Sequence, residues 1–137
     1  MEKIKLFSPV ILRIGIALVF IWFGVNQFLD TVSWTAYVPQ WMVSISFLSA
    51  ATLVHLNGVF EIVFGAALLL GFFTRVAAFL LMLHMIDITF IVGLDSIGVR
   101  DFGLSIATIA VWLNGMDFLT LDRFMKRTSG STKPDVL

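Results

Sequence analysis

The sequence predicts an all-α, membrane-spanning four-helix bundle, with an interfacial or re-entrant helix before the second span and a short amphipathic C-terminal helix. Three observations predict this fold class. The 137 residues are 59% hydrophobic, with a mean hydropathy of +1.00. Only 13% are charged, whereas a soluble domain carries about a quarter. Four apolar stretches are each long enough to cross a hydrocarbon core of about 30 Å. We therefore expect one integral membrane domain over residues 1–127 and a disordered cytoplasmic tail over residues 128–137.

Composition also excludes several classes of function. Nine basic and nine acidic residues give zero net charge, without the basic cluster that nucleic acid requires. The absence of cysteine excludes disulfides, thiolate metal sites, haem c attachment and dithiol redox chemistry on this chain. No phosphate loop, zinc spacing or dinucleotide fingerprint is present. We expect no nucleic-acid partner, no metal and no covalent cofactor.

The first span is predicted to begin at Ser8 and Pro9, as N-cap and first helical residue, and to end near Phe28. This run is too long for a signal peptide and no small-residue cleavage site follows it, so it is expected to remain as a membrane anchor.

A short polar break is predicted over residues 30–39, where Trp34, Tyr37 and Trp41 resemble an interfacial aromatic belt. Residues 41–53 are apolar but contain several hydroxyl side chains and are too short to cross alone. They are interpreted as an interfacial or re-entrant helix, or as a continuous extension of the second span, and periodicity does not decide between these.

The second span is predicted over residues 53–70, with Gly71 as its C-terminal stop. Thr74 is expected to cap the third span, which covers residues 75–92 and ends at Gly93. The very short connection makes these two helices antiparallel neighbours.

Asp101 is the predicted N-cap of the fourth span, over residues 102–119, after a loop at residues 93–99. Thr120 is expected to cap a last short helix. Its apolar and basic residues fall on opposite faces, as in a helix lying on a membrane surface: Leu121, Phe124 and Met125 against Arg123, Lys126 and Arg127.

Four crossings place both termini on one side of the membrane. Eight of the nine basic residues lie on that side and only Arg100 on the other. By the positive-inside rule, the chain is expected in the cell (plasma) membrane with both termini cytoplasmic. The eight are Lys3, Lys5, Arg13, Arg75, Arg123, Lys126, Arg127 and Lys133.

Glu61 lies well inside the second span, where a carboxylate must face a partner, water or a ligand rather than lipid. Asn57, Glu61 and Gly65 follow at a spacing of four residues and share one helix face. Gly58 and Gly65 expose bare backbone, which favours close approach by another helix.

Depth along the helices sorts the remaining polar residues into two groups. Near the cytoplasmic end, Arg13 and Asp117 fall at similar levels and are predicted to form a structural ion pair, with Asn114 beside them. In the outer half, Glu61 lies about 12 Å and Asp87 about 8 Å below the surface. The candidate ligand-binding or proton-relay residues of this outer group are Glu61, His84, Asp87, Arg100, Asp101, Asn26, Gln27 and Asn57.

The outer group contains three carboxylates and one arginine. Such a cluster is poorly neutralised unless a carboxylate keeps its proton, His84 gains one, or a cation or polar ligand enters. A purely structural network is the competing interpretation. His55 and His84 differ in depth by about 10 Å, which argues against bis-histidine haem ligation. His84 and Asp87 share a face, which suits an imidazole oriented by that carboxylate. Such an imidazole can hydrogen-bond a quinone carbonyl or relay a proton, or it is simply a buried histidine satisfied by the neighbouring aspartate.

Four stretches carry a resemblance to a known family: RIGIALVFIWFGVNQF, NGVFEIVFGAALLLGFFTR, VRDFGL and TLDRF. With these, residues 13–124 resemble the DoxX family of small four-helix membrane proteins. The resemblance implies recurrent polar positions at Glu61, Arg100 and Asp101. It also implies a role like that of quinone-linked oxidoreductase subunits, such as the thiosulfate:quinone oxidoreductase membrane subunit, or of oxidative-stress complexes. Because cysteine and an appended soluble domain are lacking, a membrane subunit that needs a partner fits better than a self-contained thiosulfate enzyme.

Three functions stay open from the sequence. The first is a quinone-associated subunit of a membrane redox complex, with quinone as its ligand. The second is a non-enzymatic carrier whose carboxylates bind a cation, a proton or a polar solute. The third is a scaffold that docks a partner through residues 34–41. The expected partners are the lipid bilayer and either a partner subunit or a second copy of the chain.

Overall fold

The computed structural model describes residues 2–93 and 95–130. The described residues are mostly helical and contain no strand, so the all-α class is confirmed. The helices found there are α1 (Glu2–Leu29), α2 (Thr31–Thr35), α3 (Gln40–Ser46), α4 (Ala50–Leu70), α5 (Thr74–Val92), α6 (Ser96–Asn114) and α7 (Leu121–Gly130).

Four of the described helices are long and apolar enough to cross a membrane: Leu6–Leu29 within α1, and all of α4, α5 and α6. The 21 residues of α4 extend about 31 Å, which matches a hydrocarbon core of about 30 Å. The predicted start at Ser8 and Pro9 is wrong, because α1 begins at Glu2 and contains Pro9. Proline lacks the hydrogen bond to the carbonyl four residues earlier and its ring crowds that carbonyl, so Pro9 weakens the first turns of α1 without ending the helix there.

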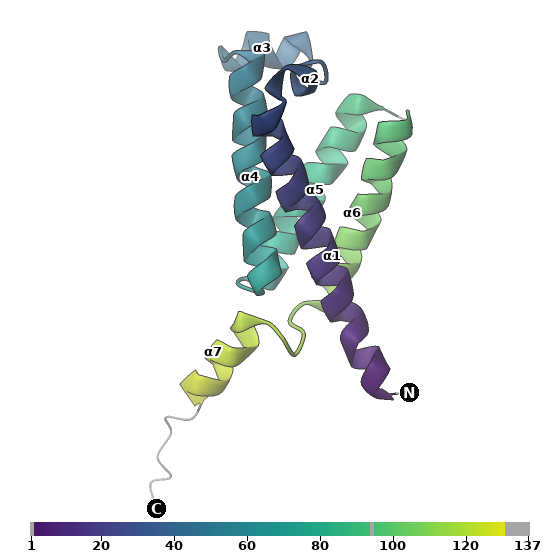
Figure 1. Cartoon of the computed structure of the whole chain (residues 1–137), viewed down its shortest axis with the longest axis vertical. Coiled ribbons are helices and arrows are strands. Elements are labelled where there is room, and N and C mark those ends of the chain that lie inside the picture. The colour runs from purple at the N-terminus through teal and green to yellow at the C-terminus, as the bar shows by residue number, and fades with distance from the viewer. Residues whose placement is uncertain (1, 94, 131–137) are drawn as a thin grey trace, which may run out of the picture.

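The spans form two pairs, α1 with α4 and α5 with α6 (Figure 1). The buried apolar core fills the half of the bundle nearest the chain termini, around Ala17, Phe20, Leu68 and Leu81. Towards the other half the two pairs diverge, at the end of the bundle where α2 and α3 lie (Figure 1). We call this the α3 end.

Two glycines bring α1 and α4 into contact. A Cβ added at Gly24 would lie 2.7 Å from the Gly58 carbonyl oxygen, and one added at Gly58 would lie 2.9 Å from the Gly24 carbonyl oxygen. Gly65 packs in the same way against Ala17 and Phe20. The predicted backbone contact at Gly58 and Gly65 is therefore present, as small residues allow between membrane helices.

The segment before the second span is a separate helix, not an extension of α4. Phe47 ends α3 in a left-handed conformation with φ of 58°, and Ser49 caps α4 by accepting a hydrogen bond from Thr52 N. No residue of α3 is buried, and α3 lies across the end of the bundle (Figure 1). The continuous extension of the second span, one of the alternatives that the sequence left open, is therefore wrong. The predicted polar break also contains a helix, α2, capped by Asp30.

The turn between α4 and α5 differs from the prediction in one respect. Gly71 ends α4 with φ of 70°, as predicted. Thr74 does not cap α5 but is its first residue. The cap comes from Asp122 of α7, whose carboxylate accepts hydrogen bonds from Phe73 N at 2.8 Å and Thr74 N at 2.7 Å.

The start of α6 corrects a second capping prediction. Asp95, not Asp101, is the N-cap, and its Oδ1 accepts hydrogen bonds from Ile97 N at 2.9 Å and Gly98 N at 2.8 Å. The helix begins this early because Gly98 has no Cβ to collide with the Gly93 carbonyl, which presses against it. Asp101 therefore lies inside the helix, 2% exposed.

The C-terminal part also differs from its predicted bounds. The fourth span ends at Asn114 rather than near residue 119, because Gly115 leaves the helix with φ of 69°. The last helix, α7, continues to Gly130, so the first residues of the predicted tail are helical. Residues 131–137 of that tail lie outside the described residues.

Candidate functional site

A cavity of about 400 Å³ lies between the two helix pairs at the α3 end. All four spans contribute to its wall, and the segment from α2 to α3 covers it. The lining side chains are apolar and aromatic with a few polar groups among them: Phe23, Gln27, Ser33, Trp34, Tyr37, Val38, Pro39, Met42, Leu53, Val54, Asn57, Glu61, His84, Met85, Asp87, Ile88, Ile91, Val92, Ile97, Arg100 and Asp101.

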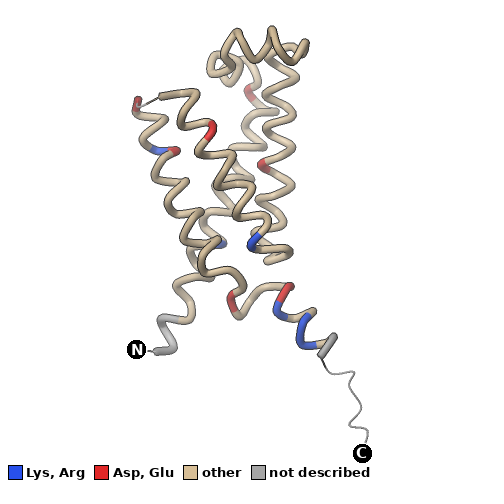
Figure 2. Tube along the Cα trace, turned by 180° about the vertical axis from the view of Figure 1, so that it is seen from behind, with Lys and Arg blue, Asp and Glu red and all other residues tan. Residues whose placement is uncertain are grey.

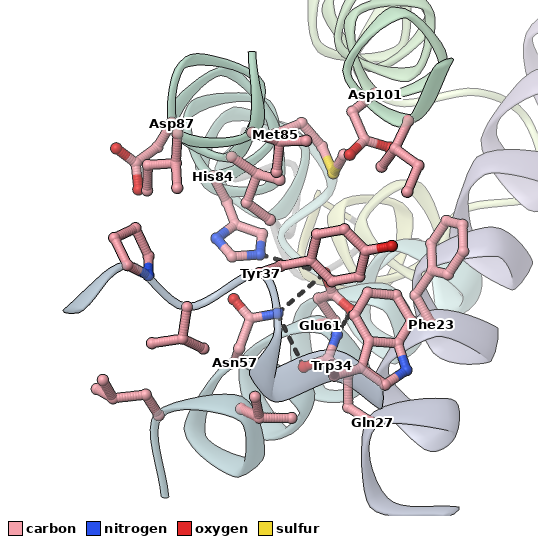
Figure 3. Close-up of a pocket in the computed structure, with 18 of the residues that line it drawn as sticks. Phe23, Gln27, Trp34, Tyr37, Asn57, Glu61, His84, Met85, Asp87 and Asp101 are labelled. Carbon is pink, nitrogen blue, oxygen red and sulfur yellow. Dashed lines mark hydrogen bonds and ion pairs between the residues drawn. The ribbon is translucent and has the colours of Figure 1, made fainter. Parts of the chain in front are cut away.

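Glu61 is the buried centre of the polar group in this wall, with 3% of its surface exposed. Its Oε2 accepts a hydrogen bond from Gln27 Nε2 at 2.7 Å. Its Oε1 is 3.3 Å from Asn57 Nδ2 and 3.2 Å from His84 Nε2 (Figure 3). Both carboxylate oxygens are therefore partnered by side chains from three different spans.

The helix crossing at the two glycines positions this group. Gln27 follows Gly24 by one turn on α1, and Asn57 and Glu61 flank Gly58 on α4. Because the backbones meet at Gly24 and Gly58, the Gln27 amide reaches Glu61, and its Oε1 also accepts a hydrogen bond from Asn57 Nδ2 at 2.9 Å.

His84 joins the group from α5. Its ring packs against Phe60, with the centroids 4.8 Å apart, and 15% of its side chain is exposed. Nε2 faces Glu61, while the other ring nitrogen faces away from it (Figure 3). An imidazole held in this way can exchange a proton with the carboxylate on one side and with a ligand on the other.

Arg100 and Asp101 form a second polar contact in the cavity wall. Arg100 Nε and Nη2 each lie 2.8 Å from Asp101 Oδ1, and the guanidinium carbon lies 4.6 Å from the centre of the Phe23 ring. Asp101 is buried and the arginine side chain is 42% exposed. The buried carboxylate is thus paired with a cation that also contacts the aromatic wall.

Asp87 lines the same cavity but lies at its margin. Its side chain is exposed, and its carboxylate is directed away from His84 and Glu61 (Figure 3). It has no hydrogen-bond or ion-pair partner within the described residues. The expected pairing of His84 with Asp87 is therefore wrong, because Glu61 takes the imidazole instead.

The structure thus brings together seven of the eight outer residues, as cavity lining, but in a different arrangement from the predicted one. Glu61 and Asp101 each have their own partners, so the three carboxylates do not form one unneutralised cluster. Asn26 is half-buried and does not line the cavity. His55 is separate from His84: its Nε2 contacts Thr31 Oγ1 at 2.9 Å, and its ring stacks on Phe28.

Sequence reasoning missed the aromatic cover of the cavity. The sequence pattern predicts that Trp34 and Tyr37 belong to a membrane-interface belt, yet both line the cavity, and Trp34 packs edge-on against Phe23. Trp41 does not line the cavity and is exposed. No local pattern could have revealed this, because the cover depends on how α2 and α3 fold over the bundle.

At the opposite end, the predicted ion pair between Arg13 and Asp117 is present and buried. Arg13 Nε donates to Asp117 Oδ2 at 2.7 Å, and Nη1 donates to the carbonyl oxygens of Leu68 and Leu69 at 2.7 and 2.6 Å. A cation on the last carbonyls of α4 also stabilises that helix end. Asn114 is exposed and has no hydrogen bond with this pair. The contact is a structural clamp away from the cavity.

Comparison with known proteins gives one match. A family model described as DoxX matches residues 8–94, which is 87 of the 137 residues. No curated protein and no solved structure matches the chain. The matched region contains Glu61, His84 and Asp87, whereas Arg100 and Asp101 lie beyond it.

Proposed function

The chain belongs to the DoxX family, and on that basis we propose that this integral membrane protein is a quinone-associated subunit of a membrane redox complex. The cavity beside Glu61 is the proposed quinone site. The observation that carries the proposal is the contact between the buried Glu61 carboxylate and the partly buried His84 imidazole, in the wall of a mainly apolar and aromatic cavity.

Size and lining support a quinone head group. Ligand cavities commonly enclose about 300–1,000 Å³ and are mostly apolar, with a small number of polar groups that orient the ligand. The present cavity of about 400 Å³ has this character. Trp34, Tyr37 and Phe23 offer flat faces for a planar ring, and the apolar α5 residues Ile88 and Ile91 offer a surface for an isoprenoid tail.

The polar pair supplies the acid–base chemistry that a quinone needs. Reduction to a quinol adds two electrons and two protons, one proton to each quinone oxygen. In the proposed mechanism His84 donates a proton to the nearer oxygen and regains one from protonated Glu61, across the 3.2 Å contact. The other quinone oxygen takes its proton from water that reaches the cavity. The electrons come from a partner redox subunit, since this chain has no cysteine for a dithiol or thiolate cluster.

Ligand-dependent stabilisation of the purified protein tests this proposal. A ligand that binds only the folded state stabilises it by about 2.7 kcal/mol at a concentration of 100 times Kd. Short-chain ubiquinone and menaquinone analogues are therefore expected to raise the thermal midpoint in detergent. Glu61→Gln should abolish or strongly reduce the shift, because the amide replaces the carboxylate that holds the His84 ring in position to bind the quinone oxygen.

Asp30→Asn is the matched control. Asp30 is an exposed carboxylate at the same end of the bundle, outside the cavity, and asparagine can also cap α2. The control should keep the full quinone shift. If no quinone analogue stabilises the unmodified protein, the proposal fails. If Glu61→Gln lowers stability but keeps the shift, Glu61 only holds the helices together and the scaffold function is favoured.

Asp87 favours one second candidate, a carrier of a cation or polar solute. Its exposed carboxylate at the cavity margin has no polar partner among the described residues and could receive such a solute. A solute flux into proteoliposomes that Asp87→Asn removes would support the carrier. A flux that is absent, together with a quinone shift, would support the redox subunit.

A further inference from the structure

The last helix, α7, is attached to the bundle at its first turn and is otherwise uncovered. Asp122 N donates to the Gly71 carbonyl oxygen at 3.0 Å, and the Asp122 carboxylate accepts from Phe73 N, Thr74 N and Thr74 Oγ1. From there α7 leads away from the spans (Figure 1). Its start is therefore fixed at the turn that joins α4 to α5.

The two faces of α7 differ in chemistry. Leu121, Phe124 and Met125 share one face and are 43%, 66% and 46% exposed. The opposite face carries three exposed basic side chains, Arg123, Lys126 and Arg127, and Figure 2 shows blue positions along this helix. Asp122 is the one acidic residue of α7, and its carboxylate accepts a hydrogen bond from Thr74 N in the α4–α5 turn.

The position of the attachment indicates what covers the apolar face. Asp122 contacts the last turn of one span and the first turn of the next, so α7 begins where the spans leave the hydrocarbon region. A short helix with a strong basic face and a compact apolar face is typical of the boundary between acyl chains and head groups. Its three cations are complementary to anionic head groups.

We propose that α7 docks on an anionic lipid leaflet. Phe124 and Met125 insert at the acyl-chain boundary, while Arg123, Lys126 and Arg127 contact lipid phosphates. Asp122 holds the first turn of α7 against the bundle, so docking also anchors the N-terminal end of α5. The interaction does not depend on what occupies the cavity.

The lack of cysteine makes single-cysteine labelling a clean test. A bimane fluorophore is attached at Phe124→Cys or at Lys126→Cys, and the full chain is reconstituted in nanodiscs. One set contains phosphatidylcholine alone and the other contains phosphatidylcholine mixed with phosphatidylglycerol. Quenching is measured with aqueous iodide and with a nitroxide on the lipid acyl chain.

In the anionic discs, the label at position 124 should be quenched by the lipid nitroxide and shielded from iodide, and the label at position 126 should show the reverse. Each basic residue near an anionic surface favours docking by about fivefold. Arg127→Gln should lower the docked fraction accordingly, and the triple change of Arg123, Lys126 and Arg127 to glutamine should abolish the response to phosphatidylglycerol. Added salt should also lower the docked fraction of the unmodified helix, because it screens the attraction between the basic side chains and the lipid phosphates.

Two results would overturn the proposal. One is equal exposure of positions 124 and 126 to iodide in anionic discs. The other is protection of position 124 that is the same in both lipids, in detergent and in the glutamine variant, which would mean that protein rather than lipid covers this face. All substituted side chains are exposed, so the variants are expected to fold.

Discussion

Glu61 illustrates how a carboxylate is accommodated inside a span. Its two oxygens receive contacts from Gln27, Asn57 and His84, so the cost of burial is offset by groups from three helices. Only the imidazole among these partners can change its charge. In the proposed mechanism the Glu61–His84 contact is therefore the part that exchanges a proton, and the two amides hold the carboxylate in position.

The buried ion pair between Arg13 and Asp117 can be tested by substitution. Arg13→Met should destabilise the protein by about 3–5 kcal/mol, because it leaves Asp117 buried without its partner. The Leu68 and Leu69 carbonyls would also lose their donor. Unfolding of the purified protein measures this, with the double variant Arg13→Met, Asp117→Leu as comparison. The double variant should recover part of the loss, whereas independent, additive losses would contradict the pairing.

At the scale of helices, the contact between α1 and α4 determines whether Gln27 reaches Glu61. Gly24→Ala should therefore cost about 1–3 kcal/mol by overpacking and should also weaken ligand binding in the cavity. The added Cβ would lie 2.7 Å from the Gly58 carbonyl oxygen, so the helices must separate.

Gly15→Ala is the control for this change. A Cβ at Gly15 meets nothing within 4 Å, although the residue is in the same helix. Alanine there should be neutral or stabilising by up to about 1 kcal/mol, as expected for a better helix former. Equal effects of the two substitutions on thermal unfolding and quinone response would show that the glycine contact does not position the site.

The sequence predicts the four spans well because each is a long apolar run, and Gly71 and Gly93 end helices where predicted. Helix starts were less predictable. Asp95 and Asp101 both precede apolar runs, and only the contact of Gly98 with Gly93 decides between them. The cap of α5 could not be predicted locally, because Asp122 lies 48 residues from Thr74.

The candidate site was also only partly predictable from the sequence. Depth along the spans brought Glu61 and His84 to one region, since a buried carboxylate must meet polar partners. Which carboxylate contacts the His84 imidazole depends on the rotation of each helix about its axis, which residue spacing does not determine. The predicted contact between His84 and Asp87 is therefore wrong. The cover by Trp34 and Tyr37 follows from the path of the chain between α2 and α3.

For the whole molecule, we propose the cell membrane as its location, with both termini cytoplasmic and the α3 end outside, on the basis of the basic residues at the terminal end. A membrane-impermeant maleimide tests this orientation in single-cysteine variants. Gln40→Cys on α3 should label in intact cells, and Lys126→Cys on α7 only after permeabilisation. The reverse pattern would place the cavity on the cytoplasmic side.

The central claim is that a quinone binds in the cavity beside Glu61, and photolabelling with an azidoquinone locates the ligand directly. In the reconstituted protein, peptide mass spectrometry should find the label on cavity residues such as Tyr37 and Met85, and excess unlabelled quinone should displace it. Labelling spread over the outward-facing side chains of the spans, without displacement, would contradict the account.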